Sequence, residues 1–148
     1  MFVDGFNVPV VAFSAYAETT ASYSPAERMQ FDQTSTNIGN AYDITTGIFT
    51  CPFDGVYLFH VFLNAVDASY SCIAQITLNG ELRNGIFADS IAGGINNMAA
   101  NTEYIECMAG NLVWVQAWSS EECYSSTRRE STFSGQLVAP FNGTFINC

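Results

Sequence analysis

A polar segment near the C-terminus, residues 119–130, gathers side chains that could bind a charged ligand. The candidate ligand-binding residues are Trp118, Glu121, Glu122, Tyr124, Arg128 and Arg129. Aromatic rings stack on the apolar faces of sugars, and arginine makes charge-assisted hydrogen bonds to carboxylates and phosphates. The segment therefore predicts a site for carbohydrate, with sialylated or other acidic glycans and phosphate-bearing microbial surfaces as the best-matched ligands.

The same segment admits a structural interpretation, in which Arg128 and Arg129 form ion pairs with the neighbouring glutamates. Those glutamates are Glu121, Glu122 and Glu130. The chain has four Lys and Arg residues together, all of them arginines, against fourteen Asp and Glu residues, so these two arginines are half of its cations. Both interpretations stay open at the level of sequence.

Catalytic motifs are absent from the sequence, which has no nucleophile elbow, phosphate-binding loop or zinc-protease motif. His60 is the single histidine and falls in a predicted strand, where a structural role is expected. The adjacent carboxylates Glu121 and Glu122 lie in the polar segment, where we expect water to surround them. The sequence predicts a protein that is not an enzyme.

The charge balance excludes several classes of partner. A net charge of -10 and a pI of about 4.1 leave too few cations to neutralise nucleic-acid phosphates or to hold an anionic lipid surface. The densest apolar stretch, Val56 to Leu63, contains His60 and is too short to cross a membrane, so no membrane insertion is expected. The acidity fits either solubility alone or the binding of calcium or a basic partner.

Five cysteines are present, at positions 51, 72, 107, 123 and 148. None forms a CxxC pair and only one histidine accompanies them, so a Cys/His metal site is not expected. The number favours an oxidising compartment with one or two disulfides. The odd cysteine would be free or intermolecular, and Cys148 at the end of the chain is the natural candidate.

Short strands separated by turn residues dominate the pattern. The predicted strands cover residues 10–17, 41–49, 56–66, 71–78, 81–87, 103–108, 112–118 and 131–139. Asn79-Gly80 predicts a type I′ hairpin turn, and Ser24 with Glu27 forms a capping-box pattern that could start a helical turn. About eight to ten strands in 148 residues predict a single all-β sandwich or barrel.

The strand that begins at Val56 is apolar on both faces. Tyr57, Phe59, Val61 and Leu63 share one face, and Val56, Leu58 and Phe62 share the other. A strand of this kind is covered on both sides. The second sheet would supply one cover and a neighbouring protomer the other, unless the strand belongs to a closed barrel with a thick core.

At this point the sequence resembles the globular domain of complement C1q. The matching pieces are 11–15 (VAFSA), 31–32 (FD), Asn37 with Gly39, 42–43 (YD), 46–59 (TGIFTCPFDGVYLF), 78–80 (LNG), 110–114 (GNLVW) and 131–140 (STFSGQLVAP). They follow the order and spacing of the family, whose Gly-Asp is Gly110-Asn111 here. The resemblance implies a 1–9 extension, a 10–140 globular domain and a 141–148 tail.

The resemblance implies a ten-stranded jelly-roll β-sandwich of the C1q and tumour necrosis factor-like type, assembled as a homotrimer. Phe49, Tyr57, Phe59 and Phe133 would be core residues, and Val56, Leu58 and Phe62 would lie at the trimer interface. Glycines 47, 55 and 135 would mark bends or close contacts. Cys148 would be available to link trimers further.

The resemblance also implies disulfides and a metal site. Family members often bridge the cysteine of the FTCP run to one a strand later, which implies Cys51–Cys72 and leaves Cys107–Cys123 as a second bridge. Some members bind calcium near the trimer axis. Asp89 lies near that position, where Asn96 or Asn97 could add oxygen ligands.

Together these observations predict a secreted, trimeric, non-enzymatic recognition protein with lectin-like binding of carbohydrate or microbial surfaces in innate immunity. Asn142 begins an N-glycosylation sequon, which mildly supports secretion. A cytokine-like or synaptic-type ligand that clusters a protein receptor, and an extracellular structural or storage protein, are the alternatives.

Overall fold

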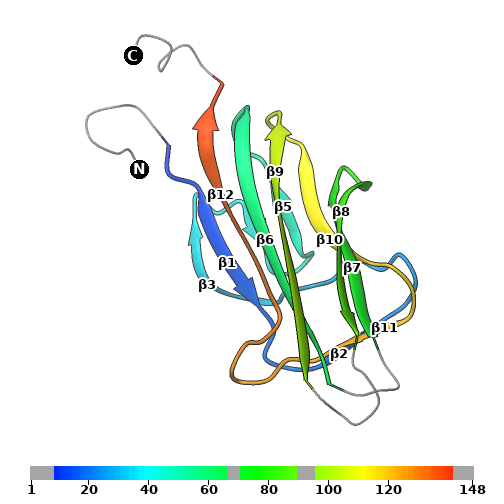
Figure 1. Cartoon of the computed structure of the whole chain (residues 1–148). Helices are drawn as coiled ribbons and strands as arrows, with labels where there is room; N and C mark the ends of the chain where they lie inside the picture. Colours follow the sequence, from blue (N-terminus) through cyan, green and yellow to red (C-terminus); the bar gives the residue numbers. More distant parts are fainter. Residues whose placement is uncertain (1–8, 67–70, 90–95, 142–148) are drawn as a thin grey trace.

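A computed structural model describes residues 9–66, 71–89 and 96–141 of the chain (Figure 1). These residues form twelve β-strands and no helix. The strands are β1 (Ala12–Tyr16), β2 (Ala21–Tyr23), β3 (Gln33–Ile38), β4 (Tyr42–Asp43), β5 (Ile48–Thr50), β6 (Gly55–Ala65), β7 (Ser71–Leu78), β8 (Glu81–Asp89), β9 (Asn97–Cys107), β10 (Leu112–Ala117), β11 (Glu121–Cys123) and β12 (Thr132–Pro140). Within this part of the chain, nothing helical is long and apolar enough to cross a membrane.

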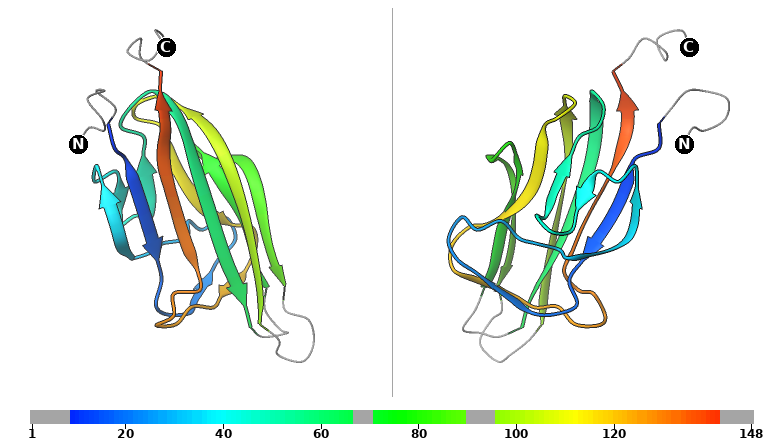
Figure 2. Two further views of the ribbon diagram at one scale, coloured as in Figure 1. Left: turned by 60° about the vertical axis from the view of Figure 1, so that its left-hand side comes forward. Right: turned by 180° about the vertical axis from the view of Figure 1, so that it is seen from behind.

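The strands form a jelly-roll sandwich of two five-stranded antiparallel sheets (Figure 2). The first sheet has the order β3-β1-β12-β6-β9, and the second has the order β4-β5-β10-β7-β8. A third, two-stranded sheet of β11 and β2 lies at the end of the sandwich opposite to the end of β12 (Figure 1). The ten strands of the two main sheets match the predicted number, and a closed barrel is not formed.

The core between the two main sheets is built largely from aromatic rings. The inward residues of β6, which are Tyr57, Phe59, Val61 and Leu63, are fully buried, as are Phe49 and Phe133. The Phe13 ring stacks on the rings of Tyr42 and Phe49, each with centroids 4.9 Å apart, and meets Phe133 edge-on at 5.0 Å. The four aromatics expected in the core are therefore confirmed there.

Gly80 and Gly135 occupy positions that favour glycine for two different reasons, a turn conformation and a close contact. Asn79 and Gly80 join β7 to β8 with φ angles of 52° and 87°, as a type I′ turn requires. Gly135 faces the core rings, and a Cβ atom there would lie 2.6 Å from Cδ1 of Phe59. The aromatic core therefore needs the absence of a side chain at position 135.

The capping-box pattern at Ser24 and Glu27 forms only in part. The Ser24 amide donates to the Glu27 carboxylate at 2.8 Å, but no helix follows. The chain instead runs along β10, where the Met29 amide donates to the Val115 carbonyl and the Ala117 amide donates to the Glu27 carbonyl. The Glu27 amide donates to the Ser24 carbonyl and closes a single turn, but the long-range bonds occupy the groups that a helix would have needed, so the turn does not continue into a helix.

Side chains link the edges of the two main sheets. The amide of Asn84 on β8 donates to the Thr102 carbonyl on β9, and the amide of Asn101 on β9 donates to the Gly85 carbonyl on β8, both at 2.8 Å. Beside them, Arg83 and Glu103 form an ion pair at 3.6 Å. We call these contacts the amide clasp; they hold the sandwich closed along the edge where β8 and β9 meet.

The predicted disulfide pairing is wrong. Cys72 is bonded to Cys123, with Cα atoms 4.9 Å apart, whereas Cys51 and Cys107 are buried free thiols. The bridges Cys51–Cys72 and Cys107–Cys123 cannot form because the sandwich separates their members. Cys72 begins β7 beside β11, while Cys51 is hydrogen-bonded to the turn that follows Cys107 at the opposite end.

The outer face of β6 is only partly covered. Val56 and Leu58 are half-buried there, and Phe62 is 40% exposed. Tyr104 on β9 lies opposite Leu58 and is 61% exposed. The second sheet covers the inner face of β6. The described part of the chain therefore buries one of the two apolar faces that were expected to be covered. The other cover, a neighbouring protomer, stays a prediction.

Candidate functional site

An open pocket lies where the far end of β6 meets the segment that follows β11. Its lining residues are Asn64, Asn96, Met98, Tyr124, Arg128 and Glu130. Asn64 on β6 and Met98 on β9 are register partners, so the two strands form its floor. The pocket has a volume of about 360 Å³, at the small end of the range for ligand sites.

Asn64 in this pocket lacks a hydrogen-bond partner for its side-chain oxygen, as does Asn84 on β8 among the described residues. Asn64 is 5% exposed, and its side-chain oxygen Oδ1 is buried without a hydrogen bond, although its main-chain oxygen accepts from the Tyr124 amide at 2.8 Å. A buried acceptor left unpaired costs about 1–3 kcal/mol, and most such groups in proteins are paired. A hydroxyl or N–H of a bound molecule would remove that cost if binding displaced the atoms that cover Oδ1.

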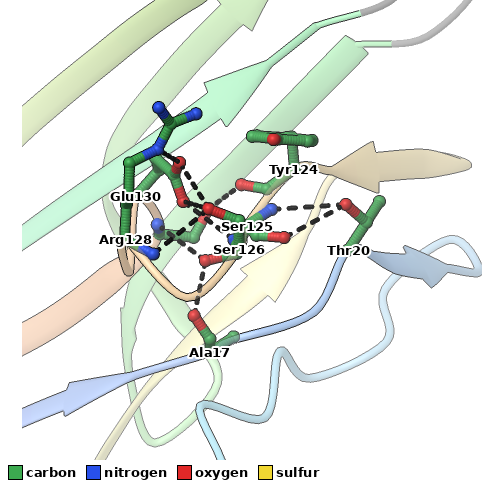
Figure 3. Close-up of polar contacts among 8 residues, drawn as sticks. Ala17, Thr20, Tyr124, Ser125, Ser126, Arg128 and Glu130 are labelled. Atoms are coloured by element: carbon green, nitrogen blue, oxygen red, sulfur yellow. Dashed lines mark hydrogen bonds and ion pairs between the residues drawn. The ribbon is translucent and has the colours of Figure 1, made fainter.

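The segment 124–131 above this floor is fixed by its own hydrogen bonds (Figure 3). Ser125 donates through Oγ to the Ala17 carbonyl, and its main chain exchanges two bonds with the Thr20 hydroxyl. The Ser131 hydroxyl donates to the Tyr124 carbonyl at 2.8 Å. These hydrogen bonds thus fix the backbone that carries the pocket residues Tyr124, Arg128 and Glu130.

Glu130 and Arg128 give the pocket a charged rim. The Glu130 carboxylate accepts from the amide and the hydroxyl of Ser126 at 2.8 Å, and from Nε of Arg128 at 3.2 Å. Burial alone would raise the pKa of Glu130, but these hydrogen bonds outweigh burial and lower it. The Arg128 side chain remains 79% exposed, so most of its guanidinium faces solvent (Figure 3).

A second pocket of similar size lies near β3 and β4, but two of its polar side chains, Asn37 and Asp43, are already hydrogen-bonded. There the Asn37 side chain donates to the Tyr42 carbonyl at 2.9 Å and accepts from the Tyr42 amide. The Asp43 carboxylate accepts from the amide and hydroxyl of Thr45, and the hydroxyl bond is the main reason why its pKa is lowered. The unpaired oxygen of Asn64 therefore distinguishes the first pocket, which we call the Asn64 pocket.

The structure disperses the six ligand-binding residues that the sequence grouped together. Tyr124 and Arg128 line the Asn64 pocket. Arg129 instead pairs with Glu18 at 3.5 Å, and its guanidinium lies 4.0 Å from the centroid of the Tyr16 ring. The structural interpretation thus holds in part, with Glu18 and Glu130 as the partners of the two arginines.

Glu121 and Trp118 lie away from the pocket lining. Glu121 is 3% exposed and its carboxylate accepts four hydrogen bonds, so the expectation that water surrounds it is wrong. Trp118 is 63% exposed and follows β10, next to Ile73 of the second sheet. Glu122 is half-buried in β11, opposite Ser22.

The sequence matches the model of the C1q domain family over residues 12–138. The chain belongs to this family. Caprin-2 from Danio rerio is 30% identical over 131 residues, which cover 86% of this chain and 14% of that protein. A complement C1q subcomponent protein from Rattus norvegicus is 28% identical over 135 residues, which cover 89% of this chain and 54% of that protein. The chain thus spans at most about half the length of these relatives.

Solved structures show the same fold at low sequence identity. The globular domain of zebrafish complement 1qA matches with a TM-score of 0.74 and 16% identity over 88% of this chain and 98% of that chain. Eiger TNF from S. frugiperda matches with a TM-score of 0.74 and 13% identity over 91% and 96% of the two chains. The C1q and tumour necrosis factor-like jelly roll expected from the sequence is confirmed.

The predicted calcium ligand of this C1q domain, Asp89, lies outside the Asn64 pocket. Asp89 is exposed at the end of β8, and its carbonyl accepts from the Asn97 side chain. Among the described residues, no three His, Cys, Asp or Glu side chains gather into a metal site. One chain therefore offers calcium few charged oxygens, and the calcium site stays a prediction. Asn142 and Cys148 lie outside the described residues.

Sequence reasoning missed Asn64, Met98 and the part that Glu130 plays at the pocket. One signal for Asn64 was present, because it is a lone amide in the largely apolar run from Val56 to Ala65. A polar residue in such a run is either hydrogen-bonded or functional. No comparable signal marked Met98. It lines the pocket because it is the register partner of Asn64 where β9 pairs with β6.

Proposed function

We propose that this C1q domain is part of a secreted, non-enzymatic recognition protein that binds acidic carbohydrate in the Asn64 pocket. The observation that carries the proposal is the buried, unpaired Oδ1 of Asn64 in one pocket with the exposed guanidinium of Arg128. The pocket therefore favours a ligand that carries a hydrogen-bond donor at one end and an anionic group at the other.

Acidic sugars meet both requirements within one small molecule. A carboxylate or phosphate would bind the exposed terminal nitrogens of Arg128, while a sugar hydroxyl or an N-acyl N–H would donate to Asn64. Neutral sugars lack the first contact, and fully ionised inorganic anions lack the second. Sialylated chains and phosphate-bearing microbial glycans both belong to the favoured class.

Trimer formation would multiply this weak contact. The outer face of β6, with Leu58 half-buried and Phe62 exposed, supports the proposal that three copies pack there. Three linked pockets raise overall avidity without any new contact. Secretion is supported by the Cys72–Cys123 disulfide, since such bonds persist in oxidising compartments. With a net charge of -10, nucleic acid is not proposed as a partner.

A glycan array probed with the wild-type chain and with Arg128→Gln tests the proposal. We expect binding to sialylated or phosphorylated glycans that free sugar competes and that Arg128→Gln weakens at least tenfold. Arg129→Gln is the matched control, because that neighbouring guanidinium contacts Tyr16 and Glu18 instead. Equal binding by the wild type and Arg128→Gln would contradict the assignment. Repeating the array with EDTA tests the calcium prediction at Asp89.

The substitution Asn64→Leu tests the unpaired oxygen directly. It removes the buried acceptor with little change in volume, so thermal stability should be unchanged or higher and acidic-sugar binding should be lost. A clear fall in stability would show that Oδ1 has a structural partner. If no saccharide binds and pull-downs recover a single receptor, the cytokine-like alternative holds instead. Abundance in an extracellular matrix with neither property would favour a structural or storage role.

A further inference from the structure

Cys51 and Cys107 meet at the end of the sandwich opposite to the Asn64 pocket. Cys51 follows β5 of the second sheet and Cys107 ends β9 of the first sheet. Both residues are 0% exposed and belong to the same core cluster. The pair therefore spans the two layers of the sandwich, and neither the Cys72–Cys123 disulfide nor the proposed binding site involves it.

The backbone holds the two cysteines side by side. The Cys51 amide donates to the Asn111 carbonyl at 2.9 Å, and the Cys51 carbonyl accepts from the Gly110 amide at 2.8 Å. Cys107 is the register partner of Gly55, four residues beyond Cys51. The Asp54 carboxylate also accepts from the Ala109 amide at 2.7 Å, so the turns on both sides of the pair are fastened to each other.

The two buried thiols lie close enough to shift each other's pKa, and they shift it in opposite directions. The interaction with Cys107 is the main reason why the pKa of Cys51 is raised far above its usual value, and burial adds to it. The interaction with Cys51 lowers the pKa of Cys107, and the Arg83 guanidinium lowers it further. Cys107 is therefore the sulfur that ionises first.

We propose that Cys51 and Cys107 form a second intrachain disulfide that joins the two sheets after the chain has folded. The oxidant is a small disulfide such as oxidised glutathione. The Cys107 thiolate attacks one glutathione sulfur and releases one glutathione thiolate, which leaves a mixed disulfide on Cys107. Cys51 loses its proton and attacks the Cys107 sulfur, which releases the second glutathione thiolate. Two protein thiols are oxidised, and one glutathione disulfide is reduced to two thiols.

The two bridges would then fasten the two ends of the molecule separately. Cys72–Cys123 ties β7 to β11 at the end that holds the Asn64 pocket, and Cys51–Cys107 would tie β5 to β9 at the far end. All four cysteines expected in bridges would be used, in partnerships different from those the resemblance implied. Because both thiols are buried, oxidation needs a local opening of the turns and should be slower than that of an exposed thiol.

Peptide mapping of the wild-type chain before and after incubation with oxidised glutathione tests the proposal. We expect a new peptide that joins Cys51 to Cys107, an intact mass lower by two hydrogens, and an unchanged Cys72–Cys123 peptide. The melting temperature should rise by about 5–15 °C, since the new bridge closes a long loop. Two alkylatable thiols at positions 51 and 107 after prolonged oxidation, or either cysteine joined to Cys148, would overturn it.

The single variants Cys51→Ala and Cys107→Ala separate the roles of the two sulfurs. In Cys51→Ala, Cys107 should accumulate a stable glutathione adduct, because no second thiol resolves it. In Cys107→Ala, Cys51 should react at least tenfold more slowly, because the Arg83 charge that favours the thiolate acts on Cys107. Equal rates in the two variants would contradict the assignment of Cys107 as the attacking sulfur. If a variant fails to fold, the wild-type peptide map decides the proposal by itself.

Discussion

Glu121 shows how one buried carboxylate can hold several elements together. Its oxygens accept from the Ser71 hydroxyl at 2.8 Å and the Ile73 amide at 3.2 Å, both on β7. They also accept from the hydroxyl and the amide of Ser119, which precedes β11. The side chain therefore joins the start of β7 to the turn that leads to the disulfide partner Cys123.

Replacing this residue should destabilise the fold rather than alter recognition. We expect Glu121→Ala to lower the free energy of unfolding by about 2–4 kcal/mol, because buried donors on two segments lose a charged acceptor. Urea unfolding followed by Trp fluorescence measures the change. Glu122→Ala, at a half-buried neighbouring position, is the control and should cost less than about 0.5 kcal/mol. Similar losses in the two variants would contradict the role of Glu121.

Two buried tyrosines and one half-buried tyrosine give the stability a defined dependence on alkaline pH. Burial raises the pKa of Tyr23 to about 12, and burial also raises the pKa values of Tyr42 and Tyr57 far above the ordinary value. The hydroxyls of Tyr42 and Tyr57 donate to the Phe31 and Phe53 carbonyls, both at 2.7 Å. A raised pKa in the folded state favours the neutral ring, so its stabilising effect is full below about pH 10 and is lost as the pH rises above that value.

An absorbance titration of phenolate at about 295 nm checks this expectation. Tyr23, Tyr42 and Tyr57 should ionise late, together with unfolding. Stability measured by thermal melts should show no loss from these rings through neutral pH and should decline above about pH 10. A single transition of all tyrosines near pH 10 in the folded protein would contradict the burial of these rings.

At the scale of the strands, the apolar pattern predicts some elements well and others poorly. The strands from Val56, Ser71 and Leu112 follow the sequence because their alternating residues face a core. By contrast, β9 begins at Asn97, well before the expected start at Glu103, because its first half is held by cross-strand pairing with β6 and not by apolar side chains. Short polar strands such as β3 were missed for the same reason.

Pairings that depend on three dimensions were beyond the sequence. The bond between Cys72 and Cys123 requires β11 to lie beside β7, which no local pattern indicates. The Asn64 pocket likewise depends on where the 124–131 segment lies across β6. Tyr124 and Arg128 were identified from their chemistry, whereas Asn64 and Met98 entered only through the register of β6 and β9.

The contact between β12 and the aromatic core makes a prediction at this scale. Gly135→Ala should lower the free energy of unfolding by about 1–3 kcal/mol, because the new methyl group would lie 2.6 Å from Phe59 and 2.9 Å from Phe13. Gly85→Ala on β8 is the control, since the nearest atom there is 3.8 Å away. Chemical denaturation of both variants measures the difference, and a neutral Gly135→Ala would show that the rings can move aside.

For the whole molecule, the open face of the first sheet predicts assembly. Phe62→Glu should break the proposed trimer, because it places charge among the apolar residues of β6 and β9. Sedimentation velocity should then report a mass near 16.1 kDa in place of three times that value. Phe87→Glu is the control, because Phe87 is also exposed but belongs to β8 in the second sheet. A wild-type chain that sediments as a monomer would contradict the prediction.

The amide clasp has a consequence for how this protein avoids unwanted association. β8 and β9 are the last strands of their sheets, and such margins offer unpaired carbonyls on which a foreign strand can grow. Here the side chains of Asn84 and Asn101 occupy the Thr102 and Gly85 carbonyls, so one acceptor on each margin is already hydrogen-bonded. We expect these two asparagines to reduce fibrous aggregation along that border in concentrated solution.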